Sequence, residues 1–385
     1  MTDLTRLTTI SDLRNLARRR VPKMFYDYVD SGSWSESTLR ANTSDFESIK
    51  FRQRVAVDIS NRNTSVDIFG VSSKMPCAIA PVGLLGMQHA DGEIIASMVA
   101  EDFGIPFTLS TMSICSIEDV ARHARVPFWF QLYVMKDHSF SRKLIDRAKA
   151  VGCSALMLTV DLQILGQRHK DIKNGLSTPP RLTVKNILNL MEHPKWCLNM
   201  LKTPRKSFRN IVGHVDGISD ISKLSAWVSE QFDPKLSWED VARIRDWWGG
   251  KFIIKGIMEP EDASEAIKIG ADAIVVSNHG GRQLDETTSS ISMLPSIVSE
   301  VGGKVSVWMD GGIRSGQDIL KAIALGAENT LVGRSFCYGL AALGSQGGKK
   351  ALNILHKELD MTMALCGHRD IRKVNRSILK NKIDF

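Results

Sequence analysis

From about residue 70 onward, short apolar runs alternate with longer stretches of mixed polarity. Each run ends in polar or glycine residues, and many of the stretches between runs close at a glycine. This rhythm is typical of a parallel sheet, because each pair of parallel strands needs a long crossover, usually a helix. The runs predict eight strands, at residues 77–80, 106–109, 128–132, 155–160, 252–255, 273–276, 305–309 and 330–332.

Two of the connecting stretches have clear helix signals. Residues 260–270 and 315–326 each carry acidic side chains near the first turn and end at a glycine. Acidic side chains stabilise the positive end of the helix dipole, and glycine adopts the left-handed conformation that closes many helices. Eight strand–helix units favour an α/β fold of the (β/α)8 TIM-barrel class. We expect one domain over residues 1–385, with a helical N-terminal extension over residues 1–70.

A barrel of this class places its active site at the carboxyl ends of its strands. Nearly every predicted strand end carries a polar side chain or a glycine, as a shared pocket requires. The sixth end is the most distinctive, because Ser-Asn-His-Gly-Gly-Arg follows at residues 277–282. An imidazole accepts a proton near neutral pH, and a guanidinium binds a carboxylate through two parallel hydrogen bonds. His279 and Arg282 therefore predict chemistry on a small acid.

Glycine-rich turns with arginines follow the seventh and eighth strands, at residues 310–314 and 333–334. Taken singly, a Gly-Arg pair is typical of a tight turn with a solvated arginine. Together, these turns lie where TIM barrels commonly bind phosphate. No G-x-G-x-x-G motif opens a β-α-β unit, so a phosphate-bearing cofactor here is more consistent with FMN than with a nicotinamide dinucleotide.

Composition argues against several other classes. The formal charge of +8 suits an anionic ligand or surface but is too diffuse to indicate nucleic acid. The six cysteines are far apart and form no C-x-x-C pair, which predicts reduced thiols in a cytoplasm-facing protein and no metal cluster. Residues 21–30 include Pro22, Lys23 and Asp27, so we expect no secretory signal. No run of about 18 apolar residues occurs, so we expect no transmembrane helix.

The strand-end motifs resemble those of the FMN-dependent α-hydroxy acid oxidase and dehydrogenase family. The likeness covers nearly the whole chain, from residues 22–32 to residues 361–365. Within the family it is greatest for the bacterial membrane-associated L-lactate dehydrogenases, through residues 80–84 and 107–111. The resemblance implies oxidation of an L-2-hydroxy acid, L-lactate first among them, to the 2-oxo acid. Its most specific motifs lie at residues 130–133, 158–161, 277–285, 307–314 and 333–334.

The resemblance also implies roles for the residues that would meet the substrate. His279 is the expected base, which takes a proton from C2 of the substrate or from its hydroxyl. Asp161 would stabilise the imidazolium that results, because an adjacent carboxylate favours the charged form. Whether C2 loses a proton or a hydride is left open. The expected substrate-binding side chains, through charge or hydrogen bonding, are Tyr28, Tyr133, Arg168 and Arg282.

For FMN, the resemblance implies a cradle drawn from most of the strand ends. Lys255 is expected beside N1 and O2 of the flavin, where a cation stabilises the negative charge of the reduced ring. Asp310 would meet the ribityl hydroxyls. The ring would also contact Pro81, Val82, Gly83, Ser110, Gln131, Thr159 and Ser277, and the phosphate would contact Gly311, Gly312, Ile313, Arg314, Gly333 and Arg334.

Four positions bear on the substrate and on the electron acceptor. Gln163 stands where the family frequently has proline, and Gln167 stands where its oxidases often have a second arginine. Met112, where plant oxidases carry tryptophan, would line the side-chain pocket and leaves the preferred acid open. Gly83 stands where oxidases tend to have alanine. This glycine favours a dehydrogenase that passes electrons to quinone or a cytochrome over an oxidase that forms hydrogen peroxide.

The connection between strands four and five, roughly residues 170–240, is far longer than an ordinary crossover. Between residues 179 and 209, apolar side chains and Trp196 are interspersed with basic residues that include Arg205 and Arg209. This composition fits a helix lying in an anionic membrane surface. A lid or an oligomer contact packed on the barrel is the alternative. The resemblance favours a peripheral protein on the cytoplasmic side of the membrane, and it implies a homo-oligomer, a tetramer in the family.

Two further functional classes are considered beside the oxidase. An FMN barrel isomerase would share the phosphate end of the pocket, but it has no need for a histidine base with a carboxylate partner and two arginines. A non-catalytic membrane-binding module would not need polar groups at so many strand ends.

Overall fold

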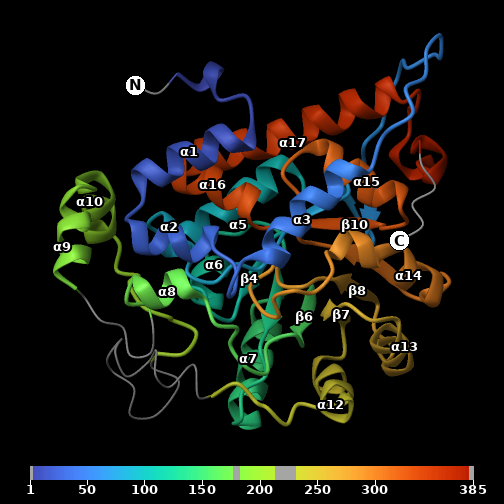
Figure 1. The fold of residues 1–385 in the computed structure, drawn as a ribbon. Coiled ribbons are helices and arrows are strands. Elements are labelled where there is room, and N and C mark those ends of the chain that lie inside the picture. The colour runs from blue at the N-terminus through green and yellow to red at the C-terminus, as the bar shows by residue number, and fades with distance from the viewer. Residues whose placement is uncertain (1–2, 177–182, 213–230, 381–385) are drawn as a thin grey trace.

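Eight parallel strands form a sheet that curls into a barrel (Figure 1). They pair in the order β3-β10-β9-β8-β7-β6-β5-β4, and a parallel bridge between Ile79 and Phe107 joins the two edges of the sheet. The computed structural model describes residues 3–176, 183–212 and 231–380. The strands are β3 (Cys77–Ile79), β4 (Thr108–Ser110), β5 (Trp129–Leu132), β6 (Ala155–Thr159), β7 (Lys251–Ile257), β8 (Ala273–Val276), β9 (Ser306–Met309) and β10 (Asn329–Val332).

The predicted TIM barrel is confirmed. Every predicted strand matches an observed strand to within two residues at either end, and the prediction for β8 has the same bounds. Most of these strands are buried along their whole length. Burial on both faces explains why they appear in the sequence as continuous apolar runs and not as alternating patterns.

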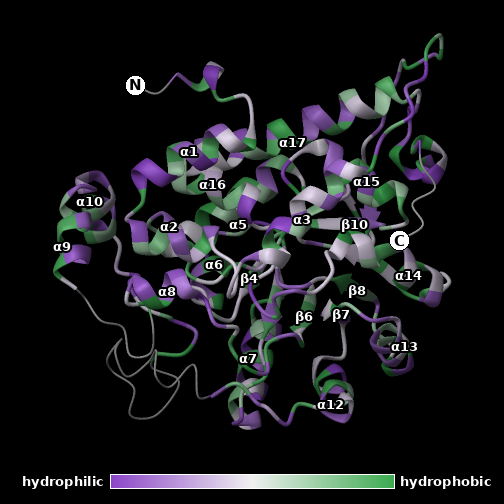
Figure 2. Cartoon of the chain, in the orientation of Figure 1, coloured by the Kyte–Doolittle hydropathy of each residue, from purple (hydrophilic) through white to green (hydrophobic). Residues whose placement is uncertain are grey.

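Helices surround the barrel and carry both hydrophobic and polar residues along their lengths (Figure 2). In α13 the buried residues are Ala263, Ala266 and Ile269, and the helix ends at Gly270 with φ of 83°. The helices that follow the strands are α4 (Leu85–Gln88), α5 (Gly92–Phe103), α6 (Ile117–Ala121), α7 (His138–Ala150), α8 (His169–Lys173), α12 (Trp238–Trp248), α13 (Pro260–Ile269), α14 (Ser290–Val301), α15 (Gly316–Ala324), α16 (Arg334–Leu343) and α17 (Ser345–Leu365).

A hairpin of β1 (Val66–Ile68) and β2 (Val71–Ser73) closes the amino-terminal mouth of the barrel. Its Phe69 ring lies 5.2 Å from the ring of Trp308, which stacks in turn on Trp129 at 5.3 Å. These aromatic groups pack with the apolar side chains inside the barrel. Among the described residues, the opposite mouth, at the carboxyl ends of the strands, has room for a ligand.

The N-terminal extension is bound to the loop that follows β8. It consists of α1 (Ile10–Arg20), α2 (Lys23–Asp30) and α3 (Ser37–Ser48). The side-chain amides of Asn42 and Asn278 exchange two hydrogen bonds, at 2.8 and 2.9 Å. The carboxylate of Asp285 accepts from the backbone N–H of Thr38 at 2.8 Å and from the hydroxyl of Ser35 at 2.7 Å. Although burial opposes the shift, these donors lower the pKa of Asp285 to about 2.

The expectation of one helix between residues 179 and 209 is wrong. Residues 177–182 lie outside the described part of the chain, and two short helices follow, α9 (Val184–Met191) and α10 (Pro194–Lys202). Pro194 occupies the first turn of α10, because a proline inside a continuous helix removes a hydrogen bond and clashes with the preceding turn. Arg205 and Arg209 are not simply solvated charges beside these helices, since both pair with buried Asp119.

In the described residues, no helix has the length and the apolar character that a bilayer crossing demands.

Candidate active site

A cavity of about 820 Å³ opens at the carboxyl ends of the strands, beneath α2. Most of the predicted site residues line it. Of the four others, Ser110, Gln131 and Ser277 are buried, and Asp161 is partly buried beside His279. The predicted residues in the lining are Tyr28, Pro81, Val82, Gly83, Tyr133, Thr159, Arg168, Lys255, His279, Arg282, Asp310, Gly311, Gly312, Ile313, Arg314, Gly333 and Arg334.

His279 and Asp161 form a hydrogen-bonded pair, with Nδ1 of the imidazole 2.9 Å from Oδ1 of the carboxylate. Burial lowers the pKa of His279 below its ordinary value, and the Asp161 carboxylate opposes that shift only in part. The imidazole is therefore neutral near pH 7. With Nδ1–H donating to Asp161, Nε2 is left as a proton acceptor, and the hydroxyl of Tyr133 lies 3.5 Å from it.

The backbone is unusual at His279 itself and at Gly256, which packs against Asp161. His279 has φ of 58°, in the left-handed region that few residues other than glycine adopt. Its N–H donates to the hydroxyl of Ser277 at 3.2 Å. Gly256, in an irregularity of β7, has φ of 111°, and a Cβ there would lie 2.7 Å from Cβ of Asp161. The glycine thus gives Asp161 the space it occupies.

Lys255 and Asp310 form an ion pair at the centre of the site. The ammonium lies 3.1 Å from Oδ2 of Asp310 and donates to the hydroxyl of Ser277 at 2.8 Å. Burial favours loss of the proton, but the carboxylates of Asp310 and Asp161 outweigh it and raise the pKa of Lys255. The site therefore holds a fixed positive charge at the end of β7.

Two arginines lie side by side at one end of the cavity. The guanidinium of Arg282 stacks on the ring of Tyr28, 4.7 Å from its centre, and donates to the backbone carbonyl of Tyr28. Burial and the nearby Arg282 cation lower the pKa of Arg168. The carboxylate of Asp171 is 3.8 Å from Arg168, too far for a close ion pair. This end of the cavity is suited to a bound carboxylate.

The turns after β9 and β10 form the other end. Gly312 contacts the N-terminal extension so closely that a Cβ would lie 1.7 Å from the carbonyl oxygen of Asn42. The guanidinium of Arg334 donates to the carbonyls of Val29, Gly280 and Ser31 at 2.7 to 2.8 Å. Arg334 was expected to contact the phosphate, but its side chain instead binds the extension to the loop after His279. Burial and the Arg314 cation lower its pKa to about 10.

The polar groups of the cavity fit FMN. Among the described residues, the buried side-chain atoms at the site that make no hydrogen bond include Nε2 of Gln131, Oγ1 of Thr159 and Oδ1 of Asp310. Such groups need a partner that the protein does not provide. The polar edge of a flavin, a ribityl chain and a phosphate beside Arg314 and the start of α16 would supply those partners.

Sequence reasoning missed several residues that shape the site. The side-chain amide of Gln283 donates to the carbonyls of Asp161 and Ile164, both at 2.8 Å, and so fixes the loop after β6. Asp171 faces the two arginines, and its spacing of three residues from Arg168 was an available signal. Phe208 and Phe232 line the cavity from the long insertion, where nothing in the local sequence marks them.

Comparison with known proteins gives consistent results. A family model described as FMN-dependent dehydrogenase matches residues 17–381. An L-lactate dehydrogenase of Haemophilus influenzae is 44% identical over 374 residues, which are 97% of this chain and 98% of that protein. One of Acinetobacter baylyi is 41% identical over 97% of both chains. The crystal structure of the monotopic membrane protein (S)-mandelate dehydrogenase is 36% identical with a TM-score of 0.93, covering 98% of this chain and 100% of that one.

Replacing Gly256 tests the packing beneath Asp161. Gly256→Ala should push the carboxylate away from His279 and lower the pKa of the imidazole further, as followed by NMR titration with His279→Gln for assignment. Gly270→Ala is the matched control, since Gly270 also has positive φ but has no atom near its Cβ position. Both variants should lose about 1–2 kcal/mol of stability to backbone strain. An unshifted His279 titration in Gly256→Ala would contradict the packing argument.

Proposed function

Because this chain belongs to the family of FMN-dependent dehydrogenases, we propose that it oxidises L-lactate, or a similarly small L-2-hydroxy acid, to the 2-oxo acid. The observation that carries the proposal is the convergence of Arg168 and Arg282 with the His279–Asp161 pair in one cavity. A 2-hydroxy acid needs both, a cationic group for its carboxylate and a base beside its C2 carbon. The relatives of nearly equal length that are L-lactate dehydrogenases support lactate as the substrate.

FMN in the cavity would supply the acceptor for the two electrons that leave C2. Arg168 and Arg282 bind the substrate carboxylate and orient C2 and its hydroxyl toward His279. Tyr28 and Tyr133 donate hydrogen bonds to the carboxylate or the hydroxyl oxygen. Nε2 of His279 accepts the proton from C2 or from the hydroxyl, and the charge of Asp161 stabilises the imidazolium that forms.

The remaining site residues hold the cofactor. Lys255 would place its positive charge where the flavin gains negative charge on reduction. The backbone of residues 81–83 would contact the ring, and Ser110, Gln131, Thr159 and Ser277 would bond to its polar atoms. Asp310 would bind the ribityl hydroxyls. Phosphate contacts would come from Gly311, Gly312, Ile313 and Arg314 and from the backbone of Gly333 and Arg334 at the start of α16.

The surroundings of Gly83 support a dehydrogenase, with a quinone or a cytochrome as the electron acceptor. A Cβ at this position would lie 2.9 Å from the hydroxyl of Tyr28 and 3.3 Å from Cβ of Met112. The site is therefore packed around a glycine, because the methyl group of an alanine would have to displace Tyr28 or Met112. The competing outcome is reoxidation of the flavin by oxygen with release of peroxide. The experiment that identifies the substrate also tests this outcome.

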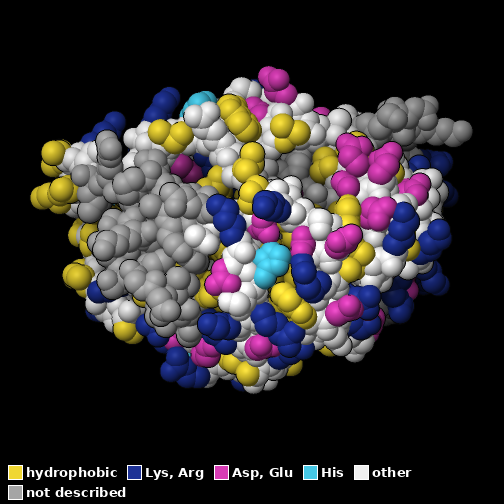
Figure 3. All heavy atoms as spheres, turned by 90° about the horizontal axis from the view of Figure 1, so that it is seen from below, with side chains coloured by type: hydrophobic (Ala, Val, Ile, Leu, Met, Phe, Trp, Pro, Cys, Tyr) yellow, Lys and Arg dark blue, Asp and Glu magenta, His cyan; other side chains and the backbone are white. Residues whose placement is uncertain are grey.

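We also propose that α9 and α10 attach the protein to a membrane surface. Six apolar side chains on them are 50–75% exposed, namely Val184, Ile187, Leu188, Met191, Leu198 and Leu201. Figure 3 shows hydrophobic side chains at the edge of the molecule where these two helices lie in Figure 1. An exposed apolar group of this size marks an interaction site. The (S)-mandelate dehydrogenase of similar fold is a monotopic membrane protein.

The association of this chain into a homo-oligomer stays a prediction.

The first test is anaerobic reduction of the FMN-loaded protein by L- and D-hydroxy acids. L-lactate should bleach the flavin absorbance, and D-lactate should not. His279→Gln should retain FMN and lose at least about 100-fold in reduction rate, because a general base contributes that much or more. Admission of oxygen or of a quinone analogue then identifies the acceptor. Failure to bind FMN, or bleaching that is equally fast without His279, would contradict the proposal.

The pH dependence tests the state of the base. A protonated imidazole cannot accept a proton, so the limiting rate of flavin reduction should fall as pH drops through the pKa of His279. Because burial lowers this pKa, the inflection should lie below the ordinary value of about 6.5. Asp161→Asn removes the group that raises it, so the inflection should move lower still and the plateau rate should fall. An inflection above pH 7 in the parent protein would be inconsistent with this account.

Membrane attachment is tested by vesicle flotation. Serine at Ile187, Leu188, Met191 and Leu198 should abolish flotation with anionic vesicles and leave flavin reduction by L-lactate intact. The control carries serine at exposed apolar residues elsewhere, Val126, Met361 and Leu365. Equal flotation of both variants would overturn the assignment of α9 and α10.

A further inference from the structure

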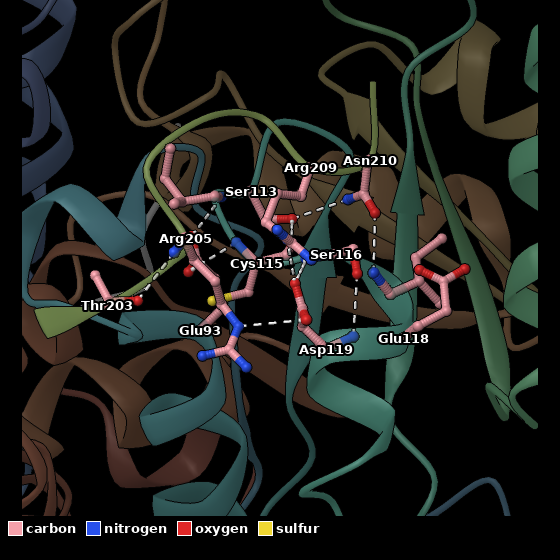
Figure 4. Close-up of polar contacts among 12 residues, drawn as sticks. Glu93, Ser113, Cys115, Ser116, Glu118, Asp119, Thr203, Arg205, Arg209 and Asn210 are labelled. Atoms are coloured by element: carbon pink, nitrogen blue, oxygen red, sulfur yellow. Dashed lines mark hydrogen bonds and ion pairs between the residues drawn. The ribbon is translucent and has the colours of Figure 1, made fainter. Parts of the chain in front are cut away.

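The long insertion returns to the barrel through residues 203–212, which pass beside the loop after β4 (Figure 4). Asn210, in this return segment, is fully buried and bonds to four groups between the end of β4 and the start of α6. Its amide nitrogen lies 2.9 Å from the hydroxyl of Ser113 and 3.4 and 3.3 Å from the carbonyls of Ser110 and Thr111. Its amide oxygen accepts from the backbone N–H of Ile117 at 2.9 Å.

The loop that Asn210 binds carries groups of the active site. The hydroxyl of Ser110 donates to the amide oxygen of Gln131 at 3.0 Å and accepts from the backbone N–H of Met112 at 3.1 Å. Met112 lines the cavity, and its carbonyl accepts from the N–H of Leu84, next to Gly83, at 3.0 Å. A displacement of this loop would therefore reach the flavin edge and the substrate pocket together.

Glu93 holds the same loop from the other side. Its buried carboxylate accepts from the backbone N–H groups of Gly86 and Ile114, both at 2.9 Å, and so joins α4 to the loop after β4. Glu93 lies on α5, one of the helices that surround the barrel. Asn210 supplies the opposing contact from a segment 93 to 100 residues away in the sequence. Figure 4 shows the two side chains on opposite sides of the loop.

The return segment has little freedom to move away. Arg209 donates to the buried carboxylate of Asp119 at 2.7 Å, in the first turn of α6. The guanidinium of Arg147 donates to the backbone carbonyl of Asn210 at 2.9 Å and to both carboxylate oxygens of Glu118. These contacts fix the backbone at position 210, so its side chain can act as a rigid support.

We propose that Asn210 is a positioning residue of the flavin site. It holds the loop of residues 110–113 so that Ser110 and Met112 meet the cofactor and the substrate. The insertion is then a structural part of the active site as well as the carrier of α9 and α10. This inference rests on the proposed function for the roles of Ser110 and Met112.

Only an amide side chain can donate to the oxygens of Ser110, Thr111 and Ser113 and also accept from the N–H of Ile117. A leucine would leave the buried N–H of Ile117 without its acceptor and would remove the amide donor from the hydroxyl of Ser113 and the carbonyls of Ser110 and Thr111. An aspartate would still accept from Ile117, but it would place a carboxylate against the carbonyls of Ser110 and Thr111. The two substitutions therefore remove the support in different ways while keeping the side chain close to its size.

The test compares Asn210→Leu and Asn210→Asp with Thr203→Val. Thr203 is the matched control, because its hydroxyl donates to Asp91 at 2.6 Å and joins the same segment to the barrel without touching the loop. All three variants should melt at lower temperature. Only the Asn210 variants should shift the visible bands of bound FMN, release FMN more readily and lower the limiting rate of flavin reduction by about tenfold to 100-fold.

Unchanged flavin bands, FMN affinity and reduction rate in a folded Asn210 variant would overturn the inference, as would equal changes in Thr203→Val. Asn210→Asp keeps the contact to Ile117 and serves if Asn210→Leu does not fold. Measurements on the parent protein distinguish a failure of the proposed function from a failure of the inference about Asn210. If no hydroxy acid reduces its flavin, the proposed function fails, while the FMN bands and affinity still report whether Asn210 positions the loop.

Discussion

The site depends on buried positive charge that the carboxylates of the described residues match only in part. Arg168 and Arg282 lie together at one end of the cavity, and burial with mutual repulsion lowers the pKa of Arg168. Arg314 and Arg334 lie at the other end, where the same effects act on Arg334. Burying an unpaired cation is costly, so the folded protein favours ligands that bring an anion to each end. A hydroxy acid carboxylate and the phosphate of FMN meet that requirement, and Lys255 and His279 lie between them with their own carboxylate partners.

Segments outside the barrel hold this arrangement in place. The carbonyls of Val29 and Ser31 in the extension accept from Arg334, and the amide of Asn42 binds Asn278 beside the strained backbone of His279. The cost of a left-handed histidine is of order 1–3 kcal/mol, and contacts of this kind are what maintain it. Asn210 supports the loop after β4 from the insertion in a similar way. The barrel supplies the strand ends, while the extension and the insertion fix their geometry.

The sequence was informative wherever a functional side chain lies next to its strand in the chain. Parallel strands buried on both faces appear as apolar runs, and the residues proposed to be catalytic follow those runs directly, so the placing of His279, Asp161 and Lys255 at strand ends could be predicted without a structure. Contacts between distant segments could not. The partners of Arg334, Gln283 and Asn210 lie far away in the chain, and no periodicity marks such pairs. Arg205 and Arg209 were misjudged for the same reason, because their carboxylate partners belong to another part of the barrel.

The most direct measurement is a crystal structure of the FMN-loaded protein with pyruvate bound. The account predicts the phosphate at the turns after β9 and β10, the pyruvate carboxylate between Arg168 and Arg282, and C2 of pyruvate within contact distance of Nε2 of His279. A carboxylate bound away from both arginines, or a C2 carbon out of reach of His279, would contradict the assignment of this cavity to hydroxy acid oxidation.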